Sequence, residues 1–104
     1  MALSLIPLSR GLTDALEASA LELQDAQASY AGAVVAHAEA KRALELARAR
    51  LLCEGVDGKN AEAREAAMRL TLEHEHDALF QAEVALTEAR CQLDCARIEW
   101  DTAR

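Results

Sequence analysis

Apolar residues, most of them leucine, recur at every seventh position along two long segments of this chain. The first ladder consists of Leu16, Leu23, Tyr30, His37, Leu44 and Leu51, and the second of Leu72, Leu79, Leu86, Leu93 and Trp100. An alanine ladder follows each, at positions 26, 33, 40 and 47 and at positions 82, 89, 96 and 103. Two apolar positions per seven residues predict a helix that packs on another helix, as in a coiled coil.

A polar segment from Glu54 to Asn60 separates the two ladders and holds two of the four glycines. Such a short turn folds two helices back on each other. We therefore predict an all-α, antiparallel two-helix coiled-coil hairpin, with a helix over 12–53, a turn over 54–60 and a helix over 61–104. Thr13 and Asn60 are the expected N-caps, and Gly55 is the expected left-handed residue after the first helix.

Residues 1–11 form a predicted N-terminal arm. The arm is rich in leucine and isoleucine, whereas Pro7 and Gly11 discourage one uninterrupted helix through it. Two interpretations stay open: the arm folds onto its own hairpin, or it docks into another subunit or a partner groove.

The composition predicts a thin seam and not a thick core. Of the 104 residues, 52% are apolar but only 3% are aromatic, and alanine supplies much of the apolar share. A chain of this length forms one domain at most, and two helices alone bury little surface per residue. Small scaffolds of this kind usually require staples or oligomerisation.

A further set of apolar residues lies off the ladders, and we call it the second stripe. Its members are Phe80, Val84, Cys91 and Ile98 in the second helix and Leu21 and Val35 in the first, with Ala28 between the last two. One seam cannot bury both the ladders and the second stripe. We therefore expect a homo-oligomer, most simply a dimer that forms a four-helix bundle, and in addition another protein as partner.

Charge and hydropathy exclude several other classes of protein. The net charge of −7 argues against broad capture of nucleic acid or anionic membrane. No apolar run approaches the roughly 18 residues of a membrane span, and Met1 to Pro7 lacks the basic residues of a signal peptide. An odd number of cysteines, three, fits a reducing compartment. We expect a cytoplasmic protein without membrane contact.

The charge is unevenly placed along the chain. Residues 41–69 hold seven basic and five acidic residues, which leaves four basic and 13 acidic residues elsewhere. One interpretation is a solvated surface with ion pairs along each helix, such as Glu65 with Arg69. Another is a basic tip, made of Lys59, Arg64 and Arg69, that contacts the phosphates of nucleic acid. The acidic remainder could bind a basic protein surface.

The densest polar cluster runs from Glu73 to Asp77 and is a candidate metal site. Glu73-x-x-His76 has the helical spacing found in di-iron bundle proteins, and His74 and Asp77 are also one turn apart. If the hairpin folds about residue 57, contacting positions have numbers that add up to about 112–116, which places His37 near Glu75. A polar contact between these two would set the register of the helices. We favour that interpretation and predict no cofactor.

Cys91 and Cys95, one turn apart, could bind zinc as a set of four in a twofold dimer. Burial as small apolar residues is the alternative that we favour. The chain shows no nucleophile–base pair, and Gly58-Lys59 lacks the rest of a phosphate-binding loop. We therefore expect no enzymatic activity.

The stretch from Asp57 to Ala66, followed by spaced leucines and alanines, resembles part of small helical proteins of phages and prophages. This resemblance covers about half of the chain and implies a non-catalytic accessory role. Taken together, the sequence predicts a non-enzymatic scaffold, adaptor or inhibitor that acts through protein–protein contacts. A nucleic-acid accessory protein and a metal-binding bundle are the alternatives.

Overall fold

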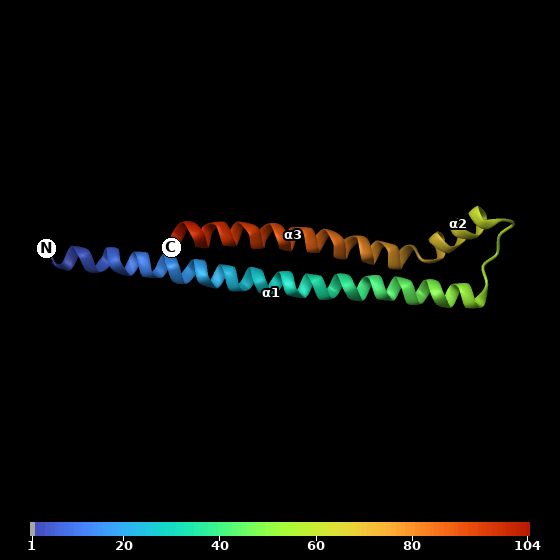
Figure 1. Cartoon of the computed structure of the whole chain (residues 1–104), viewed down its shortest axis with the longest axis horizontal. Coiled ribbons are helices and arrows are strands. Elements are labelled where there is room, and N and C mark those ends of the chain that lie inside the picture. Colours follow the sequence, from blue (N-terminus) through green and yellow to red (C-terminus); the bar gives the residue numbers. More distant parts are fainter. Residues whose placement is uncertain (1) are drawn as a thin grey trace. The chain divides into compact units, whose positions relative to one another are not determined.

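The computed structural model describes the backbone of residues 2–104 and the side chains of residues 11–104. Three helices follow one another along the chain: α1 (Ala2–Glu54), α2 (Ala61–Thr71) and α3 (Glu73–Ala103) (Figure 1). The described residues contain no strand. The predicted all-α class is confirmed.

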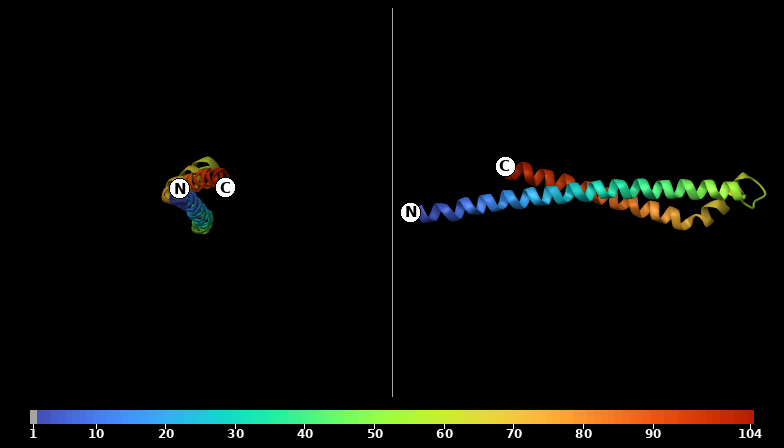
Figure 2. Two further views of the ribbon diagram at one scale, coloured as in Figure 1. Left: turned by 90° about the vertical axis from the view of Figure 1, so that its left-hand side faces the viewer. Right: turned by 90° about the horizontal axis from the view of Figure 1, so that it is seen from below.

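The chain divides into two compact units. Unit 1 comprises residues 1–32 and 87–104, and unit 2 comprises residues 33–86. In both units a stretch of α1 packs along a stretch of α3 that runs in the opposite direction (Figure 1, Figure 2). Unit 2 also contains α2 and the loop that precedes it. The antiparallel hairpin pairing that the ladders predict is therefore present in each unit.

The two ladders face the seam, as predicted. Every member of both leucine ladders is buried or half-buried, and Leu72 and Leu93 are each only 5% exposed. In the alanine ladders Ala26, Ala89 and Ala96 are buried, and only Ala103, at the end of α3, is exposed. Because alanine adds little bulk, it lets two helices approach closely while leucine fills the space between them.

Two glycines and an asparagine shape the loop between α1 and α2. Gly55 has a φ of 90°, in the left-handed region that glycine adopts without strain, and its amide donates to the carbonyl of Leu51 at 3.0 Å. The amide of Ala63 donates to the Asn60 side-chain oxygen at 2.8 Å. A Cβ on Gly58 would lie 2.8 Å from the Arg64 backbone nitrogen, so the tight loop requires glycine there. The predicted roles of Gly55 and Asn60 are confirmed.

The first helix begins earlier than predicted. α1 starts at Ala2, so Thr13 lies inside the helix and is not its N-cap. Pro7 removes one backbone hydrogen bond and Gly11 lowers helix propensity, but neither stops a helix that gains one hydrogen bond for each residue added. The contacts of the predicted arm depend on the side chains of residues 1–10, which lie outside the described residues, so both interpretations of the arm stay predictions.

The prediction of one continuous helix over 61–104 is wrong, because the chain breaks at Leu72. Leu72 has φ −98° and ψ 16°, and it separates α2 from α3. The Thr71 hydroxyl donates to the carbonyl of Ala67 at 2.9 Å, a back-bond that bends helices. The break leaves Leu72 itself and Met68 buried, at 5% and 4% exposure.

The break also changes the register within unit 2. Arg48 bonds Glu65 at 2.8 Å, and the two numbers add up to 113, inside the predicted range. His37, however, contacts Glu83 at 3.7 Å, a pair that adds up to 120, and not Glu75. The sum of the paired residue numbers is therefore larger by seven beyond the interruption at Leu72 than at α2, which is inclined to α1 (Figure 1). Since seven residues are one full repeat, the same ladder positions still face the seam.

Candidate interaction surfaces

The second stripe is exposed in both units. In unit 1 Leu21 is 60% and Ile98 66% exposed, and in unit 2 Val35 is 55%, Phe80 62% and Val84 38% exposed. Cys91 is also exposed in the single chain. The seam of one hairpin therefore leaves the whole second stripe in contact with solvent, as the sequence predicts.

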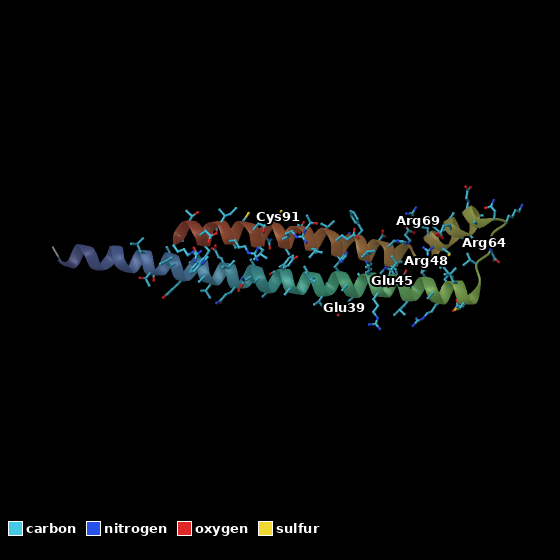
Figure 3. All side chains as sticks on the ribbon, viewed as in Figure 1. Glu39, Glu45, Arg48, Arg64, Arg69 and Cys91 are labelled. Atoms are coloured by element: carbon cyan, nitrogen blue, oxygen red, sulfur yellow. The ribbon has the colours of Figure 1, made fainter. Side chains whose placement is uncertain are left out.

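Helix geometry explains this exposure. Val84, Cys91 and Ile98 each lie two residues before a member of the second leucine ladder. At about 100° per residue, such a position lies roughly 160° around the helix from the ladder. Figure 3 shows the result for Cys91, whose sulfur points away from α1. The second stripe is thus the back of each helix, and no side chain of the same hairpin can reach across to cover it.

Several further apolar residues are exposed that the sequence analysis did not assign to a surface. The most exposed is Leu70 in α2, at 74%, and the others are Leu12, Val34, Leu46 and Leu52. Leu70 follows Arg69 and lies two residues before the break at Leu72. Their positions in the seven-residue repeat vary, so no single periodic signal identifies them.

The basic tip belongs to unit 2. Arg48, from α1, is neutralised by Glu65, whereas Lys59, Arg64 and Arg69 form no salt bridge within residues 11–104 (Figure 3). The Arg64 Nε donates weakly to the carbonyl of Asn60 at 3.4 Å. The predicted tip residues therefore come from one short region, which also contains Asp57, Glu62 and Glu65, and none of the three basic residues forms a salt bridge there.

A groove lies beside the basic tip, between α1 and α2. Its volume is about 670 Å³, and Met68 and Leu72 contribute apolar surface to its lining. Arg48, Arg69 and His76 are the cationic or titratable members of the lining, and Glu65 is among the acidic ones. A groove that combines apolar surface with mixed charges is typical of a protein contact surface. It lacks the convergent polar groups that hold a small molecule.

The polar cluster from Glu73 to Asp77 does not converge on a point. Glu73, His74 and Asp77 are exposed, while Glu75 and His76 are half-buried. Within residues 11–104, no three His, Cys, Asp or Glu side chains are arranged to hold a metal ion. The partner of His37 is Glu83, eight residues beyond the predicted Glu75, so the polar contact that we expected to set the register is made by a different residue.

A second groove, which the sequence analysis missed, lies in unit 1 between α1 and α3. Its volume is about 410 Å³, and three carboxylates line it, those of Glu22, Asp25 and Glu99. Ala26 and Ala96 supply its apolar surface, and Cys91 and Cys95 are also part of the lining. We call this feature the carboxylate groove.

Like charges face each other across the carboxylate groove. A side-chain hydrogen bond with Glu99 raises the pKa of Glu22, and repulsion between the two carboxylates and slight desolvation raise it further. Both residues directly precede a ladder member, Leu23 and Trp100 respectively. That placement was visible in the sequence, but the register needed to pair them was not.

None of the three helices has, within the described residues, a segment long and apolar enough to cross a membrane. Comparison of the chain with protein families, with curated proteins and with solved structures gives no match in any of the three. The resemblance to small phage proteins accordingly stays a prediction.

Proposed function

We propose that this chain is a non-enzymatic interaction protein that self-associates through the second stripe and, in that form, serves as a scaffold, adaptor or inhibitor of another protein. The observation that carries the proposal is the contrast between the buried seam and the exposed back of the helices. The buried core among residues 11–104 consists of six residues, three of which are alanine: Ala26, Met68, Leu72, Ala89, Leu93 and Ala96.

The energetics favour covering the second stripe. Full burial of a leucine, isoleucine or phenylalanine side chain contributes about 1.5–3 kcal/mol, whereas burial of alanine contributes much less. Leu21, Phe80 and Ile98 are each at least 60% exposed in the single chain. Large exposed apolar side chains that recur along the back of a helix are typical of an interaction site in soluble proteins. Association would therefore bury larger side chains than most of those that the seam already covers.

The experiment is light scattering on the native protein and on a variant that carries Val84→Glu and Ile98→Glu. Both positions are exposed in the single chain, so the two charges should leave the hairpin folded and disrupt only an interface. We expect an oligomer for the native protein and a helical monomer for the variant. A matched control with Gln27→Glu in α1 and Ala85→Glu in α3 adds the same charge at exposed positions about 100° around each helix from the second stripe and should stay oligomeric.

A native protein that is monomeric across the concentration range would overturn self-association. If the double variant and the control have the same mass as the native oligomer, the chain associates through a different surface.

A second candidate function rests on the basic tip. Lys59, Arg64 and Arg69, which form no salt bridge within residues 11–104, could contact phosphates of nucleic acid. Binding of this kind weakens steeply with salt, and Arg64→Ala with Arg69→Ala would abolish it. The absence of binding to DNA and RNA at low salt would exclude this function.

A further inference from the structure

The chain carries two surfaces of opposite charge, and one of them is the carboxylate groove of unit 1. Glu22, Asp25 and Glu99 form no salt bridge with any residue of the described range 11–104. Each of the two glutamates has an apolar neighbour from the second stripe: Leu21 precedes Glu22, and Ile98 precedes Glu99, at 60% and 66% exposure. Leu21 and Ile98 are not part of the lining, however, so the groove itself is an acidic depression whose apolar surface comes from Ala26 and Ala96.

The basic tip has the complementary composition. Lys59, Arg64 and Arg69 lie within eleven residues of one another, around the start of α2 and along it. Leu70, the most exposed large apolar residue in the described range, follows Arg69 directly. The tip thus combines a leucine side chain with cations that form no salt bridge within residues 11–104, whereas the groove combines alanine with carboxylates that form none there.

We propose that the basic tip of one copy docks on the carboxylate groove of a second copy. This inference rests on the self-association proposed above and names the surfaces that orient it. Arginine pairs with carboxylates through two parallel hydrogen bonds, and a pair of facing carboxylates offers more acceptor oxygens than it can use itself.

Electrostatics favour this occupant over other ligands of either surface. Glu22 and Glu99 face each other across the groove, where a side-chain hydrogen bond between them and then their like charges raise the pKa of Glu22; an incoming cation would relieve that repulsion as well as make a new ion pair. Each copy carries a net charge of −7, which opposes nucleic acid and a second copy alike, so the local charges of tip and groove are what favour the pairing. The tip and the groove are different surfaces. A twofold dimer would therefore make the contact twice, from the tip of each copy to the groove of the other.

Charge reversal tests the proposal. The tip-reversed variant carries Lys59→Glu and Arg69→Glu, which leaves Arg64 in place because its side chain packs close to Gly58. The groove-reversed variant carries Glu22→Lys and Glu99→Lys, which replaces one like-charged pair within the chain by another. Circular dichroism checks that each variant is as helical as the native protein, and sedimentation equilibrium at physiological salt measures association.

Each reversed variant alone should self-associate roughly tenfold or more weakly than the native protein, because tip and groove then carry the same sign of charge. An equimolar mixture of the two should recover native affinity, since every tip again meets a groove of opposite charge. Matched controls, Lys41→Glu with Arg42→Glu and Glu17→Lys with Glu88→Lys, change the same charge at exposed positions outside both surfaces and should associate like the native protein.

Three results would overturn the pairing. If the reversed variants associate as tightly as the native protein, tip and groove are not in contact, although self-association through the second stripe stands. If the mixture stays as weak as its components, the two surfaces do not bind each other. If the native protein is monomeric throughout, the pairing and the proposed self-association fail together.

Discussion

The two units of this chain stabilise their seams by different means. In unit 1, uninterrupted stretches of α1 and α3 close on Ala26, Leu93 and Ala96, with Leu23 and Tyr30 packed against them. In unit 2 the second helical segment is interrupted, and its seam depends on Met68 and Leu72 together with polar contacts at His37 and Arg48.

The difference shows what a seven-residue repeat can and cannot specify. In unit 1 the ladder packing is joined by one polar contact across the seam, from the Arg90 guanidinium to the Tyr30 hydroxyl at 3.3 Å, and Tyr30 is itself a ladder member, so the repeat is sufficient. In unit 2 the loop, the N-cap at Asn60 and the break at Leu72 all constrain the same short stretch. Polar contacts at exposed positions contribute little to stability, typically 0–1 kcal/mol. We therefore expect unit 1 to respond most strongly to loss of packing and unit 2 to loss of its local backbone contacts.

The largest expected effect comes from Leu93→Ala in unit 1. It should lower the free energy of unfolding by about 2–4 kcal/mol, because Leu93 is 5% exposed and its alanine neighbours cannot expand into the space. Leu72→Ala in unit 2 should cost less, since without the leucine the chain can relax at the break. Urea unfolding at low protein concentration measures both, with the exposed Ile98→Ala as a control that should change stability by about 0.5 kcal/mol or less.

The comparison would be reversed if Leu72→Ala proved as costly as Leu93→Ala or more so. The break would then be a fixed part of the core and not a place where the chain can adjust.

A smaller effect is expected from Asn60→Ala. The substitution removes the side-chain oxygen that accepts from the Ala63 amide and should destabilise α2 by about 1 kcal/mol. Hydrogen exchange should show faster exchange in α2 and no change in unit 1, and Asn60→Ser should restore most of the protection. Equal acceleration in both units would mean that α2 does not open separately from the rest of the chain.

The smallest effect concerns the carboxylate pair of unit 1. Because the folded pKa of Glu22 is raised, the folded state binds more protons than the unfolded state, and stability falls as the pH rises through that pKa. Glu99→Gln removes the charge that Glu22 faces, so it should raise the melting temperature slightly at pH 7. The gain should shrink below the ordinary glutamate pKa of 4.5, where Glu22 is protonated in both proteins.

Thermal melts at the two pH values, at low protein concentration, measure this difference. Glu88→Gln, which alters an exposed carboxylate outside the groove, is the matched control. A gain that is the same at both pH values would show that Glu22 and Glu99 do not repel each other.

The seam was predictable from the sequence because each helix repeats its pattern five or six times. Leu93 and Ala96 follow that pattern and are buried, and Ile98 departs from it and is exposed. The axial register was not predictable, because a slip of seven residues leaves the pattern unchanged. The prediction paired His37 with Glu75, whereas the structure pairs it with Glu83, eight residues further along the chain, which is close to one such repeat.

The break at Leu72 and the carboxylate groove escaped prediction for related reasons. Nothing in Thr71 or Leu72 forbids a continuous helix; the break reflects the path from the loop at Gly55 to Gly58 back onto α1. The groove exists only when Glu22 lies opposite Glu99, which the predicted register does not give. A local sequence pattern shows which face of a helix is buried. The carboxylate groove also requires a particular axial register between α1 and α3.

Self-association through the second stripe is tested most directly by the reactivity of Cys91 toward a thiol reagent. Cys91 belongs to the second stripe and Cys53 does not, and both are exposed in the single chain. Two variants keep one thiol each, Cys53→Ser with Cys95→Ser and Cys91→Ser with Cys95→Ser. We predict that Cys91 reacts more slowly as protein concentration rises, while the rate at Cys53 stays constant. Equal, concentration-independent rates at the two thiols would contradict the account.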